Sequence, residues 1–261
     1  MKFVAMNKIG SDGTIAEVVL NRPEARNAFN TEMAEELLAV FRTLADSSDV
    51  RVVVLSSSNP KSFCSGADLK ERDGMTDQQW KEQHKLFEET FYALADLPQP
   101  VIAAVDGYAL AGGFEMVLNC DFIVAAKTAT FGLPEVTRGI MPGVGASRLL
   151  AKRIGVHWAK EWLCTGRFIT AEEADKMGLV NRLTDTEHLR ETYLELAETI
   201  ARNAPIAVQA CKSAVDSLFG MDDKLARVKE LDFYNRCVDT EDRLEGVRAF
   251  VEKRPPRFSG R

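Results

Sequence analysis

Cysteine is sparse in this chain of 261 residues, and its spacing is irregular. The cysteines form no C-x-x-C pair, and an odd, scattered set predicts buried apolar thiols in a reducing compartment. The same pattern disfavours a disulfide framework and a cysteine zinc site, so we expect no metal. The five cysteines are Cys64, Cys120, Cys164, Cys211 and Cys237.

Long hydrophobic runs are also missing, although 46% of the residues are hydrophobic. No stretch approaches the roughly 20 apolar residues that a membrane-spanning helix needs. The N-terminal segment 1–13 has too short an apolar part for a signal peptide and lacks the Arg and Ser bias of a transit peptide. We therefore expect a cytoplasmic protein with no membrane partner.

Positive charge is not concentrated in any segment. The chain has 33 basic and 39 acidic residues, a formal net charge of −6. Without a basic run interleaved with aromatic residues, a nucleic-acid-binding surface is disfavoured. We expect no nucleic-acid partner, although a local basic patch for a phosphorylated ligand stays open.

Several common catalytic signatures are absent. The chain has no G-x-G-x-x-G after a strand, no phosphate-binding G-x-x-x-x-G-K-[ST], no H-E-x-x-H and no G-x-S-x-G. Its three histidines, His84, His157 and His188, lie in polar helical segments, where a lone histidine is usually not catalytic. Cys64 has no visible base partner. What remains for catalysis is carboxylates and backbone amides.

The first half of the chain alternates strand-like and helix-like segments. The strand-like segments are rich in β-branched residues, as expected of strands buried on both faces. This order predicts an α/β core with parallel strands joined by right-handed crossovers. The predicted strands are 16–20, 50–57, 101–107 and 122–126, and the predicted helices are 31–46, 77–95 and 112–120.

From about residue 144 the strand signal fades and helical periodicity dominates, so roughly the last hundred residues are predicted to be helical. Thr170 and Glu173 form a capping-box pattern, and Gly178 fits the end of that helix. Several helices have strongly apolar faces. These faces can pack on other subunits or on the chain's own core, and periodicity leaves both open.

Two strand-to-helix turns contain small residues and could expose free amides. KSFCSGADLK (61–70) and DGYALAGGFE (106–115) each place such residues before a helical continuation. Two converging amides would hold a developing oxyanion. Glycine-containing turns are also common for purely structural reasons, so only the pair is informative.

Glu115 and Glu135 are the candidate catalytic carboxylates. Each also has a structural interpretation, because a glutamate in the first turn of a helix is stabilised by the helix dipole. Twenty residues separate them, on either side of the predicted strand 122–126. Because the chain passes through one strand between them, both carboxylates could lie at the same end of the sheet. There they would support acid/base chemistry on a water.

Motifs along nearly the whole chain resemble the enoyl-CoA hydratase/isomerase, or crotonase, family. The resemblance implies a crotonase-like spiral of ββα units over residues 1–195. It further implies a helical region over 196–261 for trimerisation and for covering the acyl pocket. A homotrimer or dimer of trimers, an acyl-CoA thioester substrate and a role in fatty acid metabolism such as β-oxidation are implied as well. No cofactor is implied, since coenzyme A is part of the substrate. The matching segments are 21–30, 63–72, 106–126, 131–150, 166–183 and 241–261.

The resemblance also assigns roles to single residues. The thioester oxygen would be bound by the amides of Ala67 and Gly112, and the two glutamates would be the catalytic pair of a hydratase. Glu115 would deprotonate the water that attacks C3, and Glu135 would supply the proton at C2 of a trans-2-enoyl-CoA. The implied substrate and CoA contacts are Arg22, Ala25, Arg26, Ala67, Asp68, Leu69, Lys70 and Gly112.

Other interpretations stay open. Ala111 replaces a frequent glycine, and PGVGASR (142–148) replaces the more common PGAGGTQR. FCSGADLKER also resembles methylglutaconyl-CoA hydratases, some of which bind RNA. The alternatives are therefore a branched-chain hydratase, an enoyl-CoA isomerase and, outside the enzymes, a CoA- or RNA-binding scaffold. The sequence leaves acyl chain length, reaction direction and pathway open.

Overall fold

The computed structural model describes residues 1–261, which form ten strands in two sheets together with eleven α-helices. The strands are β1 (Val4–Ile9), β2 (Ile15–Leu20), β3 (Val52–Ser57), β4 (Ser62–Cys64), β5 (Val101–Val105), β6 (Tyr108–Leu110), β7 (Phe122–Ala126), β8 (Thr130–Gly132), β9 (Phe168–Thr170) and β10 (Arg182–Thr184). The α-helices are α1 (Thr31–Ala45), α2 (Leu69–Arg72), α3 (Asp77–Ala95), α4 (Gly112–Leu118), α5 (Ala146–Ile154), α6 (Val156–Thr165), α7 (Ala171–Lys176), α8 (Leu189–Ala201), α9 (Pro205–Leu218), α10 (Asp223–Val238) and α11 (Glu241–Val251). Three short 3-10 helices are η1 (Pro23–Ala25), η2 (Pro134–Arg138) and η3 (Thr186–His188).

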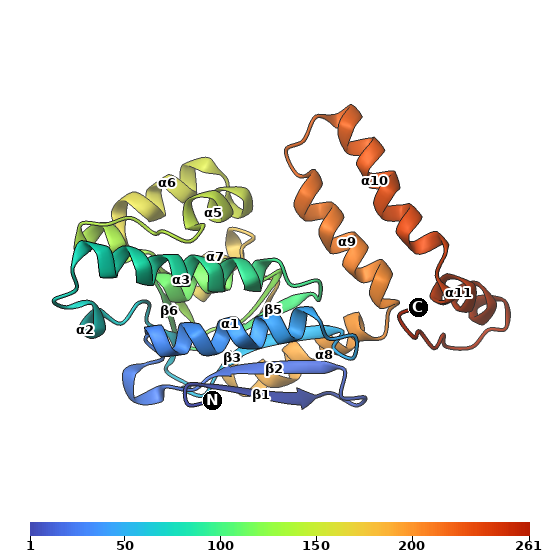
Figure 1. Cartoon of the computed structure of the whole chain (residues 1–261), viewed down its shortest axis with the longest axis horizontal. Coiled ribbons are helices and arrows are strands. Elements are labelled where there is room, and N and C mark those ends of the chain that lie inside the picture. Colours follow the sequence, from blue (N-terminus) through green and yellow to red (C-terminus); the bar gives the residue numbers. More distant parts are fainter.

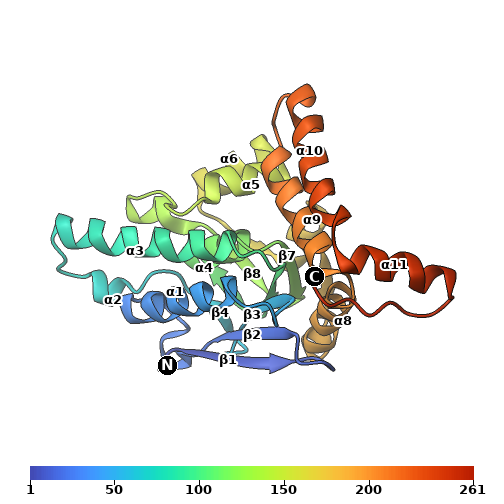
Figure 2. The ribbon, with the colours of Figure 1, turned by 45° about the vertical axis from the view of Figure 1, so that its right-hand side comes forward.

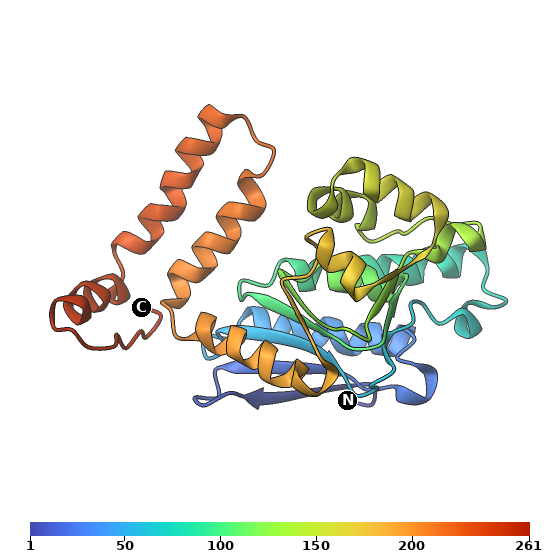
Figure 3. The same ribbon diagram turned by 180° about the vertical axis from the view of Figure 1, so that it is seen from behind.

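The larger sheet has the strand order β1-β2-β3-β5-β7-β10, with β1 antiparallel to β2 and the other pairs parallel. Both of its faces are covered, which explains the continuous apolar strands. In β3, Val53 and Leu55 belong to the main core with α1 and α3, whereas Val52 and Val54 pack with α8 on the other face. Figures 1 and 3 show α1 and α8 on these opposite faces.

The smaller sheet, β4-β6-β8-β9, was not distinguished from the sequence. Each of its strands is three residues long, too short to show a period of two. β9 and β10 also lie in the part of the chain predicted to be all-helical, so that prediction was wrong at these two places. Both are edge strands, and their pairing depends on neighbours distant in sequence.

The predicted helices and strands agree with the structure to within a few residues, and the α/β architecture is confirmed, although the six-residue strand β1 was not predicted. Local signals explain the agreement. The Asn30 side chain accepts a hydrogen bond from the Met33 amide and starts α1, and Thr76 and Gln79 form a complete capping box at α3. At α7, Thr170 caps as predicted, but Glu173 instead pairs with Arg167.

The last three helices extend away from the sheets. Figures 1 and 2 show α9 and α10 as an antiparallel hairpin that projects from the core, with α11 beside its base. The predicted domain boundary at residue 195 falls inside α8, whose Tyr193, Ala197 and Ala201 pack on the larger sheet. The chain therefore leaves the core after Ala201 rather than after 195. None of the helices combines the length and the apolar character needed to cross a membrane.

Candidate active site

A cavity of about 660 Å³ lies between α3, the β6–α4 turn, and η2 with the loop after it. Its lining contains Ala67, Gly112, Glu115 and Glu135. These four residues come from three separate segments of the chain. The structure therefore brings the predicted amides and the predicted carboxylates to one place.

The Ala67 amide is turned into this cavity by the peptide that precedes it. The Gly66 carbonyl accepts a 2.7 Å hydrogen bond from the Phe29 amide, and the N–H of the same planar peptide points the opposite way. Gly66 has a φ of +96°, and a side chain there would meet the Ala111 Cβ at 2.7 Å. The Ala67 amide donates to no protein acceptor.

Gly112 supplies the second free amide, at the first position of α4. A Cβ on Gly112 would lie 3.9 Å from the Ala67 nitrogen with no closer neighbour, so both amides open onto the same space. The preceding Ala111 has φ +50° and ψ −129°, a conformation that costs a non-glycine residue of order 1–3 kcal/mol. A 2.8 Å hydrogen bond from the Ala111 amide to the Gly132 carbonyl helps to hold it.

Glu115 is 3% exposed, and its carboxylate is held by backbone amides. Oε1 accepts hydrogen bonds from the amides of Val144 at 2.8 Å and Ala146 at 3.2 Å. The Asn119 side chain fixes the same loop through the Val144 carbonyl at 3.1 Å. Burial raises the pKa of Glu115 above its ordinary value, while the loop amides oppose the rise by favouring the anion.

Glu135 is 8% exposed, and neither carboxylate oxygen has a hydrogen-bond partner. It lies in η2 directly after Pro134, as expected for a proline-started turn. Burial raises the pKa of Glu135 to about 7; the residue's own backbone amide opposes the rise, and the charge of Glu115 adds to it. The two carboxyls thus have opposite environments: donors favour the anion at Glu115, and their absence favours the neutral acid at Glu135. Such a pair can act as base and acid near neutral pH.

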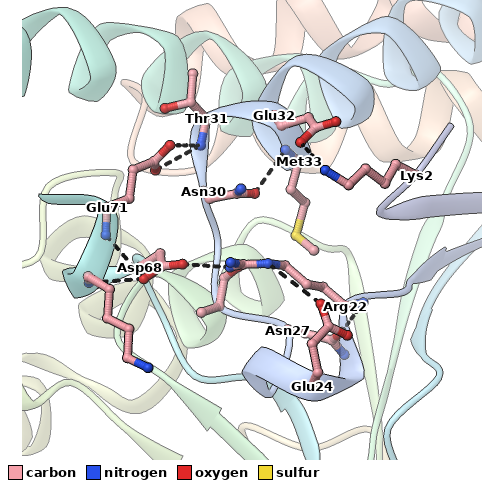
Figure 4. A network of polar contacts seen from close by, with 12 residues as sticks. Lys2, Arg22, Glu24, Asn27, Asn30, Thr31, Glu32, Met33, Asp68 and Glu71 are labelled. Atoms are coloured by element: carbon pink, nitrogen blue, oxygen red, sulfur yellow. Dashed lines mark hydrogen bonds and ion pairs between the residues drawn. The ribbon is translucent and has the colours of Figure 1, made fainter.

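Arg22 and Asp68, two of the predicted CoA contacts, are bonded to each other (Figure 4). Arg22 Nη1 donates to Asp68 Oδ2 at 2.7 Å and to the Ala28 carbonyl at 3.0 Å. Burial by itself raises the pKa of Asp68, but the Arg22 hydrogen bond and the amides of Lys70 and Glu71 lower it overall. Asp68 also caps α2. The structure thus gives this ion pair a clear structural role.

Only one of the remaining predicted contacts lines the cavity. Leu69 lines the cavity and is largely exposed, whereas Lys70 does not line it and has no ion-pair partner. Ala25 is half-buried in η1, and Arg26 is exposed with a φ of +54°. No residue of 196–261 lines the cavity, so the predicted acyl-pocket cover is not formed by the same chain.

The sequence indicated that the helix 77–95 would help to line the acyl pocket, but not through which of its faces. Trp80, His84, Phe87 and Phe91 follow helical spacing and all line the cavity, as does Arg72 from α2. His84 packs against Gly143, where a Cβ would lie 2.4 Å from its ring. The spacing was readable from the sequence, but nothing in it told which face of α3 would meet the β6–α4 turn. No group of three or more His, Cys, Asp or Glu side chains is arranged to hold a metal ion.

Comparison with known proteins places this geometry in context. The family model of enoyl-CoA hydratase/isomerase matches residues 10–261. The short-chain-enoyl-CoA hydratase of Clostridium acetobutylicum is 37% identical over 93% of this chain and 93% of its own. The human enoyl-CoA hydratase domain-containing protein 2, mitochondrial, is 40% identical over 97% of this chain and 88% of its own.

The fold agrees with the sequence comparison. The crystal structure of an enoyl-CoA hydratase from Bacillus anthracis superimposes with a TM-score of 0.96 at 39% identity, covering 99% of this chain and 100% of that one. The resemblance inferred from the motifs is confirmed, as is the crotonase-like fold with its helical C-terminal region. The chain belongs to the enoyl-CoA hydratase/isomerase family.

Proposed function

We propose that the protein is an enoyl-CoA hydratase, a hydro-lyase that adds water reversibly and in the syn sense to trans-2-enoyl-CoA, giving 3-hydroxyacyl-CoA. The observation that carries the proposal is one cavity lined by two buried carboxylates, Glu115 and Glu135, and two free amides, Ala67 and Gly112. Membership of the family and the names of its relatives support the same reaction. The reaction needs no cofactor beyond the CoA of the substrate.

In this mechanism the two amides bind the thioester oxygen. When the water oxygen bonds to C3, the electrons of the double bond move toward C1 and the thioester oxygen becomes an enolate. Each preorganised donor stabilises that charge by about 3 kcal/mol. Both donors are backbone groups, so the stabilisation depends on how the turns before Ala67 and Gly112 are held.

The glutamates move the protons. Glu115 takes a proton from the water as the oxygen–C3 bond forms, and its anion is favoured by the Val144 and Ala146 amides. Glu135 gives its proton to C2, which quenches the enolate, and its neutral form is favoured by burial without donors. Dehydration uses the same groups with their roles exchanged.

The first test follows the loss of the conjugated enoyl-thioester absorbance of crotonyl-CoA. We expect the wild type to hydrate it and Glu115→Gln and Glu135→Gln each to lose roughly 10²- to 10⁴-fold in kcat while staying folded. Glu89→Gln is the matched control. Glu89 is an exposed carboxylate on α3 outside the cavity, 3.8 Å from Arg42, and its variant should keep wild-type activity.

Two results would contradict the proposal. If both glutamine variants keep activity, the carboxylates are not the acid and base. If the wild type leaves crotonyl-CoA unchanged but moves the double bond of a 3-enoyl-CoA, the isomerase interpretation takes its place.

Assembly as a cytoplasmic homotrimer or dimer of trimers is the second part of the proposal. Its support is a set of large apolar side chains on α9, α10 and α11, and at Phe219 directly after α9, that one chain leaves exposed. They are Val215, Phe219, Leu225, Val228, Leu231, Tyr234, Leu244, Val247, Phe250 and Val251. Exposed apolar surface of this extent favours association.

A further inference from the structure

Arg72 is a cation in the cavity wall that the proposed hydration does not use. It lies at the end of α2, lines the same cavity as Glu115 and Glu135, and is half-buried. Its guanidinium lies over two aromatic rings, 4.2 Å from the Trp80 ring centroid and 5.2 Å from that of Phe87. Stacking of this kind fixes the plane of the group and lowers the entropy cost of using it.

The Arg72 side chain is also fixed by a hydrogen bond. Its Nε donates to Gln83 Oε1 at 2.7 Å. Gln83 is buried and is itself held, because its Nε2 donates to Thr31 Oγ1 at 2.9 Å and to Glu71 Oε2 at 2.7 Å. The guanidinium is thus positioned on its faces by rings and on its Nε edge by an anchored amide.

No carboxylate neutralises this charge. Arg72 forms no ion pair within 4.0 Å, and its only side-chain hydrogen bond is the one from Nε, so its two terminal nitrogens donate to no protein acceptor. The nearest candidate, Glu71, is engaged elsewhere: its oxygens accept the Thr31 amide at 3.0 and 3.2 Å, as Figure 4 shows. A half-buried guanidinium without a partner is costly, and burial lowers the pKa of Arg72 although the Glu71 charge opposes this.

The position of Arg72 points to the acyl group rather than to the CoA phosphates. Of the residues predicted to contact the substrate or CoA, Ala67, Leu69 and Gly112 line the cavity, but the charged ones do not. These are Arg22, Arg26, Asp68 and Lys70. Beyond the Ala67 and Gly112 amides, α3 lines the cavity with the aromatic side chains of Trp80, Phe87 and Phe91, which suit a hydrocarbon chain, and toward solvent with Lys81, His84, Lys85 and Glu88. Arg72 is held among those aromatic side chains.

We propose that the substrate's acyl group carries a second carboxylate, which Arg72 binds through its two free terminal nitrogens. A planar guanidinium with fixed orientation matches a carboxylate through two parallel hydrogen bonds. The substrate class is therefore a trans-2-enedioyl-CoA, with a short apolar chain between the thioester and the distal carboxylate. The inference rests on the proposed hydratase function and specifies its substrate.

The test compares acyl-CoA substrates that differ only at the end of the acyl chain distal to the thioester, where one has a carboxylate and the other a methyl group. Hydration is measured for trans-2-hexenedioyl-CoA against trans-2-hexenoyl-CoA, and for the five-carbon pair trans-2-pentenedioyl-CoA against trans-2-pentenoyl-CoA. The wild type should favour the diacid in at least one pair. Arg72→Met should lower kcat/KM for that diacid by roughly 10- to 100-fold and change the monoacid less than about threefold. Retained monoacid activity shows that the variant is folded.

Two further variants separate the effect of the planar guanidinium, with its two terminal nitrogens, from the effect of a positive charge alone. Arg72→Lys keeps the charge but loses the planar guanidinium and its stacking on the rings. It should therefore retain only part of the wild-type preference for the diacid, whereas Arg72→Met loses it. Lys85→Met removes an exposed charge from the same cavity and should leave the ratio of diacid to monoacid nearly unchanged. An equal loss in Lys85→Met and Arg72→Met would overturn the assignment to Arg72.

Binding of saturated thioesters distinguishes this inference from the hydratase proposal. Calorimetric titration with hexanedioyl-CoA and hexanoyl-CoA requires no reaction. The wild type should bind the diacid more tightly than the monoacid, and Arg72→Met should not. If the monoenoyl substrates are hydrated but neither the diacid ratio nor its binding depends on Arg72, this inference is wrong and the hydratase stands. If the diacid binds through Arg72 but nothing is hydrated, the proposed reaction is wrong and the anion site stands.

Discussion

Glu115 and Glu135 show how identical side chains acquire different properties within one cavity. Both are buried, and burial raises both pKa values. Two loop amides reach the Glu115 carboxylate, but none reaches Glu135. The separation of base from acid therefore depends on the backbone of the loop around Val144 and not on the glutamates themselves.

This separation predicts the pH dependence of catalysis. The active form of the pair carries one proton, so activity falls at low pH when both are protonated and at high pH when both are ionised. The alkaline limb of kcat/KM should lie near pH 7, where Glu135 loses its proton. Rates measured with crotonyl-CoA across the pH range would check it.

The reverse reaction supplies a strict control. Hydration takes up no net proton, so the ratio of forward to reverse kcat/KM cannot vary with pH. Dehydration of 3-hydroxybutyryl-CoA must therefore show the same two apparent pKa values. A profile that stays flat well above pH 7 in both directions would contradict the raised pKa of Glu135.

At the scale of elements, the site depends on how closely α4 approaches β4. A Cβ on Gly113 would lie 2.3 Å from the Cys64 carbonyl oxygen and 2.7 Å from the Cys64 Cβ, and both of these residues are buried. This contact sets the distance between the turn that carries Gly112 and the turn that carries Ala67.

Gly113→Ala should therefore damage both stability and catalysis. Pushing α4 away from β4 should lower the free energy of unfolding by about 1–3 kcal/mol. A displacement of Gly112 and Glu115 by an ångström should reduce kcat by roughly 10²-fold. Denaturant unfolding and crotonyl-CoA hydration measure the two effects.

Gly246→Ala in α11 is the matched control, because its nearest neighbour would be the Phe258 ring at an ordinary 3.6 Å. That variant should be as stable as the wild type or slightly more so, since alanine favours helix. Wild-type kcat in Gly113→Ala would show that α4 is not positioned by this contact.

At the scale of the whole molecule, the α9–α10 hairpin has few contacts with its own core. Lys212 of α9 pairs with Asp121 at 2.7 Å, beside a cavity of about 510 Å³ lined by Phe122, Val208 and Val215. Farther out, the apolar side chains of α10 are exposed. One chain alone leaves this surface uncovered.

The proposed assembly predicts that charges on α10 will disrupt it. The double variant Val228→Asp, Leu231→Asp places carboxylates at two exposed apolar positions and should dissociate the oligomer, because burying an unpaired charge is costly. Sedimentation velocity measures the change. Lys229→Asp, an exposed polar position on the same helix, should leave the assembly intact. A monomeric wild type would contradict the proposal.

Much of this protein was determined by local sequence. Caps, apolar stripes and β-branched runs gave the long helices and the buried strands, because these signals act within a few residues. The order of the motifs along the chain indicated the family. The two turns with small residues, 61–70 and 106–115, together with Glu115 and Glu135, indicated the candidate site. Three-residue strands such as β9 and β10 carry too little local signal to be predicted this way.

The tertiary structure decided the electrostatics and the wall of the cavity. The loop amides at Val144 and Ala146 are 29 and 31 residues from Glu115 in sequence, and Arg72 is stacked by rings of a different helix. A pKa or an unpaired charge depends on which groups surround it in space, and residues far apart in sequence supply those groups. The sequence alone determined which chemical groups were present, whereas the folded chain determined which of them are buried, partnered or free to meet a ligand.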